Sequence, residues 1–409
     1  MKINAPGIIA SKNVPDGAKK FLGFEAGTLK NNGGYITAKE ITQQPSLWTG
    51  TWRLVKERRQ ALESFLNEAY QQESLTVILT GAGTSAFIGN ALQGPFQKNT
   101  QKNTVAIATT DLISHPEHYF DDKVVLLVSF ARSGDSPESV AAVNLANELC
   151  RKVYHLIITC NPAGSLALAK SSKPAFIFLL PPGSNDQSLV MTGSFTSMLL
   201  AGLLISRIKE IEALEGTVQQ LSGYATNILD NYSEKLSAVA KLHFQRAVFL
   251  GSGPLRSVAN ESDLKLQELT GGKVICKFDS FLGFRHGPKA VIDASTLLVY
   301  LFSNNAYVHQ YEHDLVRSIA SGEKGLFSIG IAETAKKDLE LDLQIVLSPN
   351  DETVEEEFLS VCSVLPAQIL GFYKSLELGL TPDNPSKSET ITRVVKGVII
   401  YPFKHDEKI

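Results

Sequence analysis

Two short segments rich in glycine and hydroxyl side chains stand directly after apolar runs of the sequence. The first is Gly81-Ala82-Gly83-Thr84-Ser85, and the second is Arg132-Ser133-Gly134-Asp135-Ser136, which continues into Pro137. If each apolar run is a strand and each segment opens a helix, backbone N–H groups and serine hydroxyls gather at the carboxyl end of a sheet. A phosphomonoester, whose oxygens accept several hydrogen bonds, is the ligand that this pattern predicts.

The first segment also fits a dinucleotide-binding pattern. Gly81-x-Gly83-x-x-Ala86 satisfies the glycine template, and Asp111 follows an expected strand at residues 105–109, where a ribose-binding acid would stand. A nucleotide-dependent dehydrogenase is therefore an alternative, and two ordinary turns with serine caps are another. The hydroxyl-rich second segment favours the phosphomonoester.

Acid–base chemistry is suggested further along the chain. Glu261, Lys265 and Glu268 share one face of an expected helix that begins at Pro254. His286 follows in the stiff turn Gly283-Phe284-Arg285-His286-Gly287-Pro288-Lys289. A solvated salt-bridge ladder and a surface histidine are the structural alternatives.

Metal chemistry has weaker support. His309, Glu312 and His313 match an H-x-x-E-H zinc motif, but no third acidic ligand is apparent and we expect a solvent-facing helix there. The four cysteines (Cys150, Cys160, Cys276 and Cys362) are far apart, with no C-x-x-C pair. This pattern predicts no metal site and no disulfide framework, and it favours a reducing cytoplasm.

The elements that position these groups form a repeat. Each expected strand of the first half returns about 170 residues later, with alternating helical stretches between strands. The pairs are 76–80 with 247–250, 124–130 with 296–302, 156–159 with 327–330, and 176–181 with 344–349. Each half closes with an apolar helix, at 189–208 and 356–378. Continuous apolar strands that alternate with helices predict two parallel α/β domains related by duplication.

We expect four parts in the chain: an N-terminal arm at 1–50, a first domain at 51–225, a second domain at 226–380 and a C-terminal tail near the site at 381–409. The arm should be helical, with Trp48 and Trp52 packed on the first domain. Hydroxyl groups and glycine follow the second strand of the first half only, whereas the second half has Ser303-Asn304-Asn305 there. This asymmetry predicts that the first domain holds most of the ligand.

Composition excludes several classes of protein. The 409 residues carry 39 basic and 42 acidic side chains, a net charge of −3, with 44% hydrophobic residues. A basic nucleic-acid surface or a membrane-binding patch over the whole protein is not expected. The most apolar stretch, 189–205, includes threonine, serine and glycine, which favours a core helix over a membrane span. Residues 1–17 lack the apolar run of a secretory signal.

Taken together, these motifs resemble the double sugar-isomerase (SIS) family. The resemblance covers about residues 39–395 and is closest to a subgroup described as tagatose-6-phosphate ketose/aldose isomerases or galactosamine-6-phosphate deaminases. It rests on Lys39-Glu40-Ile41-x-x-Gln44-Pro45, Gly81-Ala82-Gly83-Thr84-Ser85, Ser129-Phe130-Ala131-Arg132-Ser133-Gly134, Glu261-x-x-Leu264-Lys265-x-x-Glu268, Arg285-His286-Gly287-Pro288 and Asn384-Pro385…Arg393-Val394-Val395.

The resemblance implies two tandem, doubly wound, flavodoxin-like parallel-sheet domains and a role for each motif. Glu268 would shuttle a proton between C1 and C2 of a sugar phosphate, His286 would open the ring, and Lys265 would lie beside Glu268. The expected phosphate-binding residues are Gly83, Thr84, Ser85, Arg132, Ser133, Gly134 and Ser136. Family members of this type often take the histidine from a neighbouring subunit, so a homodimer is implied, with no cofactor and no metal.

Two departures separate this chain from glucosamine-6-phosphate synthase of the same family. Ala131-Arg132 stands where that enzyme has Ser-Gln, and Lys387 is only an approximate match to its C-terminal lysine. No glutaminase domain with a terminal cysteine precedes the arm, which disfavours amination. The implied reaction is galactosamine-6-phosphate to tagatose-6-phosphate plus ammonia, in amino-sugar metabolism. The alternatives are a simple tagatose-6-phosphate isomerase or a non-catalytic sugar-phosphate-binding regulator.

Overall fold

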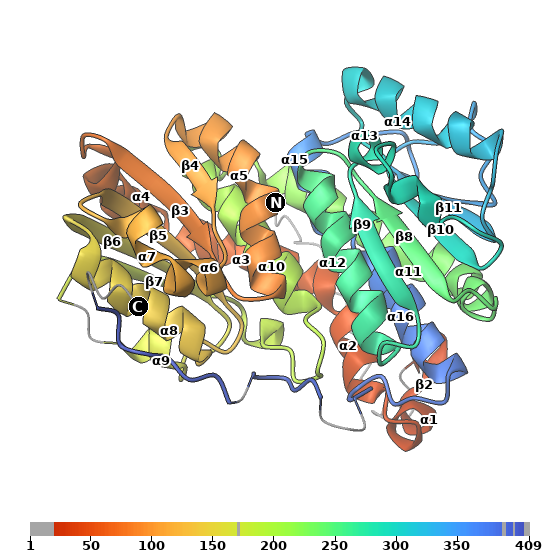
Figure 1. Cartoon of the computed structure of the whole chain (residues 1–409), viewed down its shortest axis with the longest axis horizontal. Helices are drawn as coiled ribbons and strands as arrows, with labels where there is room; N and C mark the ends of the chain where they lie inside the picture. Colours follow the sequence, from red (N-terminus) through yellow and green to blue (C-terminus); the bar gives the residue numbers. More distant parts are fainter. Residues whose placement is uncertain (1–19, 170–171, 387–389, 396, 405–409) are drawn as a thin grey trace, which may run out of the picture.

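The computed structural model describes residues 20–169, 172–386, 390–395 and 397–404. Within these residues the chain forms two lobes, each built on a five-stranded parallel sheet (Figure 1). The first sheet has the order β4 (Asn103–Ala106), β3 (Leu75–Thr80), β5 (Val124–Ala131), β6 (Lys152–Thr159) and β7 (Ala175–Leu179). The second has the order β9 (Ile275–Asp279), β8 (Arg246–Leu250), β10 (Thr296–Leu301), β11 (Phe327–Ala332) and β12 (Leu343–Val346).

Both sheets have the same strand order when each lobe is numbered from its own first strand, namely 2-1-3-4-5. This is the flavodoxin-like order of doubly wound folds, so the predicted fold class and duplication are confirmed. The four expected strand pairs are all present, at β3 and β8, β5 and β10, β6 and β11, and β7 and β12.

Helices cover both faces of each sheet, which explains the continuous apolar strands. In β5, Leu126 and Val128 belong to the large central core, while Val125 and Leu127 belong to a separate core on the outer face. The outer helices of the first lobe are α6 (Thr109–Ser114), α7 (Pro116–Phe120), α8 (Pro137–Leu149) and α9 (Ser165–Leu168). Those of the second lobe are α13 (Phe281–Phe284) and α14 (Ala306–Ala320).

The inner helices of the two lobes pack on one another and form a shared central layer (Figure 1). From the first lobe and its lead-in these are α3 (Gln44–Glu57), α4 (Arg59–Tyr70), α5 (Thr84–Thr100) and α10 (Gly193–Ser206). From the second they are α11 (Glu215–Ala240), α12 (Pro254–Leu269), α15 (Glu356–Cys362) and α16 (Leu365–Glu377). The expected domain boundary between residues 225 and 226 falls inside α11.

The described part of the N-terminal arm, from Lys20 onward, starts with a small hairpin and ends in the central layer. It comprises β1 (Lys20–Phe21), β2 (Phe24–Glu25), α1 (Ala26–Asn31) and α2 (Tyr35–Thr42), followed by α3. Trp48 donates from Nε1 to Thr196 Oγ1 of α10 at 3.0 Å, and Trp52 donates to the carbonyl of Ile211 at 2.8 Å. The predicted packing of both indoles on the first lobe is confirmed.

The apolar stretches are core helices. Every residue of α10 is buried, as predicted for the 189–205 stretch. Within the described residues, Glu356–Glu377 is the one helical segment long and apolar enough to cross a membrane, and 94% of its apolar window is buried inside the protein.

Two predicted elements are wrong in detail. The strand expected at 105–109 is β4, which ends at Ala106, and Thr109 already begins α6. The helix expected over 356–378 is broken into α15 and α16. Pro366 lacks an N–H group and its ring would clash with the carbonyl of Cys362, so the first helix ends there.

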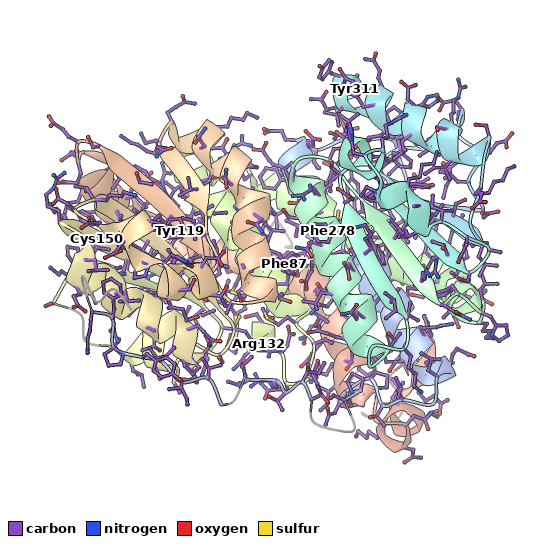
Figure 2. The ribbon with its side chains drawn as sticks, in the orientation of Figure 1. Phe87, Tyr119, Arg132, Cys150, Phe278 and Tyr311 are labelled. Carbon is purple, nitrogen blue, oxygen red and sulfur yellow. The ribbon has the colours of Figure 1, made fainter. Side chains whose placement is uncertain are left out.

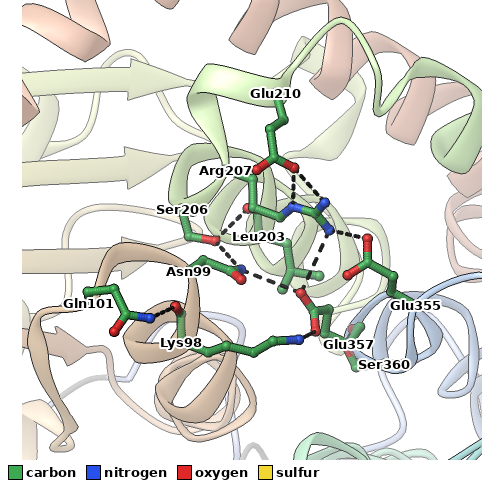
Figure 3. Close-up of polar contacts among 10 residues, drawn as sticks. All are labelled: Lys98, Asn99, Gln101, Leu203, Ser206, Arg207, Glu210, Glu355, Glu357 and Ser360. Carbon is green, nitrogen blue, oxygen red and sulfur yellow. Dashed lines mark hydrogen bonds and ion pairs between the residues drawn. The ribbon is translucent and has the colours of Figure 1, made fainter.

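A polar cluster joins the lobes at the far end of α5 (Figure 3). Arg207, at the end of α10, contacts Glu355 at 2.5 Å, Glu210 at 2.6 Å and Glu357 at 3.9 Å. The Lys98 Nζ atom of α5 also lies 3.4 Å from Glu357 Oε2. Since Glu355 and Glu357 lie at the start of α15, the cluster fixes the second lobe against α5 and α10.

Candidate active site

Matching glycine turns follow the first strand of each lobe. Gly83 has φ +55° and ψ −128°, and Gly253 has φ +53° and ψ −128°, a region that L side chains rarely adopt. A Cβ on Gly81 would lie 2.6 Å from the backbone of Ser85, and one on Gly251 would lie 2.3 Å from the Leu255 carbonyl oxygen. The repeat therefore preserves this turn in both lobes, whatever each lobe binds.

The first-lobe turn opens onto a cavity of about 290 Å³ at the carboxyl ends of β3 and β5. Gly83 and Ser85 line it from the N-terminus of α5, where the positive end of the helix dipole favours an anion. Thr84 is buried beside them and points toward α12, as its contact with Lys265 shows. The cavity is large enough for a phosphate group, and its lining combines serine hydroxyls and two arginines with apolar side chains and the buried carboxyl group of Glu138.

The second segment forms the opposite wall of this cavity. Ser133 and Ser136 line it, and Ser136 stands directly before Pro137, the first residue of α8, with its hydroxyl donating to Ser139 Oγ at 2.6 Å. Gly134 has φ +71° and packs closely on Gly164. Asp135 holds the loop from outside, because its Oδ1 accepts from the Ser165 amide at 2.8 Å and hydroxyl at 2.9 Å. The two predicted phosphate segments therefore meet at one cavity.

Arg132 lines the cavity and is anchored by carbonyl groups. It donates from Nη1 to Leu189 O at 3.2 Å and from Nη2 to Arg393 O. Burial lowers its pKa from the ordinary arginine value, while the charges of Asp186 and Glu268 oppose that change. In Figure 2 Arg132 lies at the lower edge of the first lobe, beside the C-terminal segment. Its contact with the tail was not predicted.

Glu261, Lys265 and Glu268 form a buried cluster on α12 rather than a solvated ladder. The Lys265 Nζ atom donates to Glu268 Oε2 at 2.6 Å and lies 3.4 Å from Glu261 Oε1. It also donates to Thr84 Oγ1 at 3.2 Å. Lys265 thus joins α12 of the second lobe to the turn at residues 81–85 of the first.

The three side chains differ in access to solvent. The side chains of Glu261 and Lys265 are 0% and 1% exposed, whereas that of Glu268 is 21% exposed. Burial raises the pKa of Glu261 to about 8, against the effect of the Lys265 ammonium. Burial alone would lower the pKa of Lys265, but the two carboxylates raise it above its ordinary value. Glu268 is the member of the cluster that can reach a substrate.

His286 lies apart from these residues in one chain. It is exposed in the turn after α13, followed by the short 3₁₀ helix η4 (Pro288–Val291). Helix α13 packs against α14 on the outer face of the second lobe, and His286 does not line the cavity. Glu268 does not line the cavity either, but Lys265 links it to Thr84 beside the cavity, whereas His286 stands in a separate exposed turn.

The dinucleotide and metal alternatives find no matching site. Asp111 is exposed in the first turn of α6 and does not line the cavity. Among the described residues, no group of three histidine, cysteine or acidic side chains is placed to hold a metal ion. The H-x-x-E-H helix is not simply solvent-facing, as we expected. Glu312 is fully buried and accepts the Ser303 amide at 3.0 Å, because it fills the second lobe's counterpart of the serine loop.

That counterpart is occupied throughout by carboxylates of the chain itself. Besides Glu312, Glu356 accepts from the Ser303 hydroxyl, and Glu333 accepts from the Asn304 side chain at 2.6 Å. The donors that follow β10 are therefore already satisfied. This explains why the two halves differ in sequence at this loop.

The sequence analysis did not predict which residues contact Arg132 and support it at the cavity. Arg393 of the tail donates to Asp186 O and Asn185 Oδ1, both at 2.8 Å, and Val394 and Val395 also line the cavity. Only the resemblance of the Arg393-Val394-Val395 motif indicated this segment. Lys387 lies outside the described residues.

The comparisons with known proteins agree with this geometry. The SIS domain family model matches residues 70–206, from the end of α4 to the end of α10. The D-galactosamine-6-phosphate deaminase AgaS of Escherichia coli is 39% identical over 375 residues, which are 91% of this chain and 97% of that protein. This chain belongs to the AgaS family of SIS-domain proteins.

Solved structures extend the likeness of this AgaS-family chain to three dimensions. A crystal structure from Clostridium novyi NT matches it with a TM-score of 0.91 and 41% identity, covering 95% of this chain and 100% of that one. Tagatose-6-phosphate ketose/aldose isomerase from Escherichia coli matches with a TM-score of 0.83 and 36% identity, covering 93% of this chain and 99% of that one. The likeness therefore includes both lobes.

Proposed function

We propose that this AgaS-family chain is a galactosamine-6-phosphate deaminase that forms tagatose-6-phosphate and ammonia. The observation that carries the proposal is the position of Lys265, which bonds Glu268 at 2.6 Å and Thr84 at 3.2 Å. A phosphate turn and a solvent-accessible carboxylate are thereby held in one site. The name and the coverage of the Escherichia coli relative support the same reaction.

The phosphate would bind in the first lobe. Ser85, Ser133 and Ser136 would offer hydroxyl groups to its oxygens, with Ser136 giving up its 2.6 Å bond to Ser139 Oγ, and the N-termini of α5 and α8 would add the positive ends of their helix dipoles. Arg132 adds a buried positive charge beside this anion. This part of the substrate does not react, so its role is to bind and orient the sugar.

Glu268 would carry out the proton transfer. In the open-chain sugar it takes the proton from C2 and returns it to C1, which converts the C1 aldehyde to an alcohol and the C2 amine to an imine. In the same step a proton passes from the amine nitrogen to O1. Water then adds to C2, the nitrogen is protonated by Glu268 or His286, and the carbinolamine collapses to the C2 ketone as ammonia leaves. One water is consumed, and no oxidant or reductant is needed.

A simple tagatose-6-phosphate ketose/aldose isomerase is the second candidate. It is favoured by the match to the Escherichia coli isomerase structure. The same carboxylate and the same phosphate site would serve, with a hydroxyl group in place of the amine at C2.

One assay separates these candidates. The pure protein is incubated with the 6-phosphates of galactosamine, glucosamine and tagatose, and ammonia release is followed together with ketose formation. Ammonia from galactosamine-6-phosphate supports the deaminase, whereas isomerisation without ammonia supports the second candidate. In Glu268→Gln we expect turnover to fall by about 10²–10⁴ with substrate binding retained. A variant that turns over at the wild-type rate would contradict the base assignment, and a wild-type protein that binds but never reacts would be a regulator.

We propose further that the site is completed in a homodimer, with His286 supplied by a second copy. Its exposed position in the turn after α13, on the outer side of the second lobe, supports this arrangement. Two inactive variants, His286→Ala and Glu268→Gln, can be co-expressed as a test. With shared sites, random pairing restores about a quarter of wild-type activity. If His286 acts within its own chain, the mixture stays inactive.

We also propose a cytoplasmic location. All four cysteines are free thiols, and Cys150, Cys160 and Cys362 are buried. A reducing compartment maintains that state, and cell fractionation tests the proposal.

A further inference from the structure

The loop at residues 185–189 supports both arginines of the cavity. Leu189 O accepts from Arg132 Nη1 at 3.2 Å. Asp186 O and the Asn185 side chain accept from Arg393, both at 2.8 Å. Arg132 and Arg393 both line the cavity. The position of this loop therefore sets the position of two cationic side chains beside the phosphate site.

Glu40 holds the loop from its other side. It lies on α2 of the N-terminal arm, and only 5% of the residue is exposed. Its Oε1 accepts from the Gln187 amide at 2.5 Å, and its Oε2 accepts from the Ser188 hydroxyl at 2.5 Å and the Ser188 amide at 3.3 Å. A carboxylate with several hydrogen bonds of this kind fixes a backbone segment strongly.

Among the described residues, the other hydrogen bonds near this loop do not involve the Gln187 and Ser188 amides that Glu40 accepts from. The Asp186 carboxylate is bonded to the amides of Thr192 and Ser194, further along the chain. The Leu189 amide donates to Asp383 O at 3.0 Å. Within the described part of the chain, Glu40 is the acceptor for both the Gln187 and the Ser188 amides. Its removal would leave these donors without a partner next to the carbonyl that anchors Arg132.

We propose that Glu40 is a positioning residue for phosphate binding, which acts through the 185–189 loop on Arg132. This inference rests on the proposed function, since the anion it serves is the phosphomonoester of the sugar. Glu40 does not touch the substrate. A loss of this support weakens binding of a group that does not react, so KM rises while kcat changes little.

The test compares Glu40→Ala and Glu40→Gln with Gln44→Ala. Gln44 is a matched control because it is fully buried in the same arm and bonds Gln368 at 2.7 Å, but it bonds no residue of the loop. Each variant is measured for melting temperature, for kcat and KM with galactosamine-6-phosphate, and for the dissociation constant of inorganic phosphate by calorimetry.

For Glu40→Ala we expect about a tenfold rise in KM and in the phosphate dissociation constant, with kcat within about twofold of wild type. For Glu40→Gln, KM and the phosphate dissociation constant should lie between those of wild type and Glu40→Ala, because the amide oxygen of glutamine still accepts one hydrogen bond. Gln44→Ala should lower the melting temperature without weakening phosphate binding. Equal losses of phosphate affinity in Glu40→Ala and Gln44→Ala would overturn the inference, as would an unchanged affinity in Glu40→Ala.

The two proposals fail in different ways. A wild-type protein that acts on none of the sugar phosphates refutes the proposed function, while the phosphate dissociation constants still test Glu40. A wild-type protein that binds no inorganic phosphate overturns the inference about Glu40 as well.

Discussion

At the scale of single residues, the charge balance around Lys265 decides how the site works. Two carboxylates face one buried ammonium, at 3.4 Å for Glu261 and 2.6 Å for Glu268. Burial raises the pKa of Glu261 to about 8, so this carboxyl group is largely protonated at neutral pH. Protonation removes one of the two negative charges, and Lys265 is then paired with the carboxylate that reaches solvent.

The raised pKa of Glu261 predicts a pH-dependent stability. In the unfolded chain this group titrates near 4.5, so between about pH 4.5 and pH 8 the folded protein binds the extra proton. Its contribution is therefore fully present below pH 4.5 and is lost as the pH rises through 8. Denaturant unfolding of wild type and Glu261→Gln should show a difference in stability that changes by up to about 1.4 kcal/mol per pH unit. Parallel pH profiles would show that Glu261 titrates normally.

At the scale of elements, the ends of helices fix the geometry between the lobes. Helix α5 contacts α12 through Thr84 at its start and the Arg207 cluster through Lys98 near its end (Figure 3). Both ends of α5 are thus tied to the second lobe. The distance between the turn at residues 81–85 and Glu268 therefore depends on both contacts.

A variant at Arg207 tests the contribution of the cluster at the C-terminal end of α5. Its side chain is 15% exposed and pairs with Glu357, which is 7% exposed, so Arg207→Ala leaves a nearly buried carboxylate short of a partner. We expect a loss of about 2–4 kcal/mol in the free energy of unfolding. Arg59→Ala is the matched control, because Arg59 also contacts two carboxylates but all three are a quarter or more exposed, and it should cost about 1 kcal/mol or less. The free energies of unfolding are measured with denaturant. If Arg207→Ala and Arg59→Ala lose equal amounts, the Arg207 cluster contributes no more stability than exposed ion pairs do.

Local patterns predicted elements well and long-range contacts poorly. The repeat in the strands and the Pro254 start of α12 were readable, because apolar runs and helix starts depend on neighbouring residues. The position of Lys265 beside Glu268 followed only from a family resemblance, and its contact with Thr84 was not predicted. The contacts of Glu40 with Ser188 and of Arg132 with Arg393 were not predicted, since no periodicity links an arm, a loop and a tail that meet only in the folded chain.

At the scale of the whole molecule, the two lobes share one core. A single hydrophobic cluster runs from the arm through α5 and α10 into α12 and α16. We therefore expect one cooperative thermal transition for both lobes, with equal calorimetric and van't Hoff enthalpies. Two resolved transitions in the calorimeter would mean that the lobes unfold independently.

The duplicated loop of the second lobe has a consequence for stoichiometry. Glu312, Glu333 and Glu356 occupy its donors as tethered anions that cannot diffuse away. The second half of the duplication thus carries its own anions at this loop, and on the proposed function only the first half binds a phosphate ester. A titration with inorganic phosphate should accordingly saturate at about one equivalent per chain, although the fold contains the turn twice.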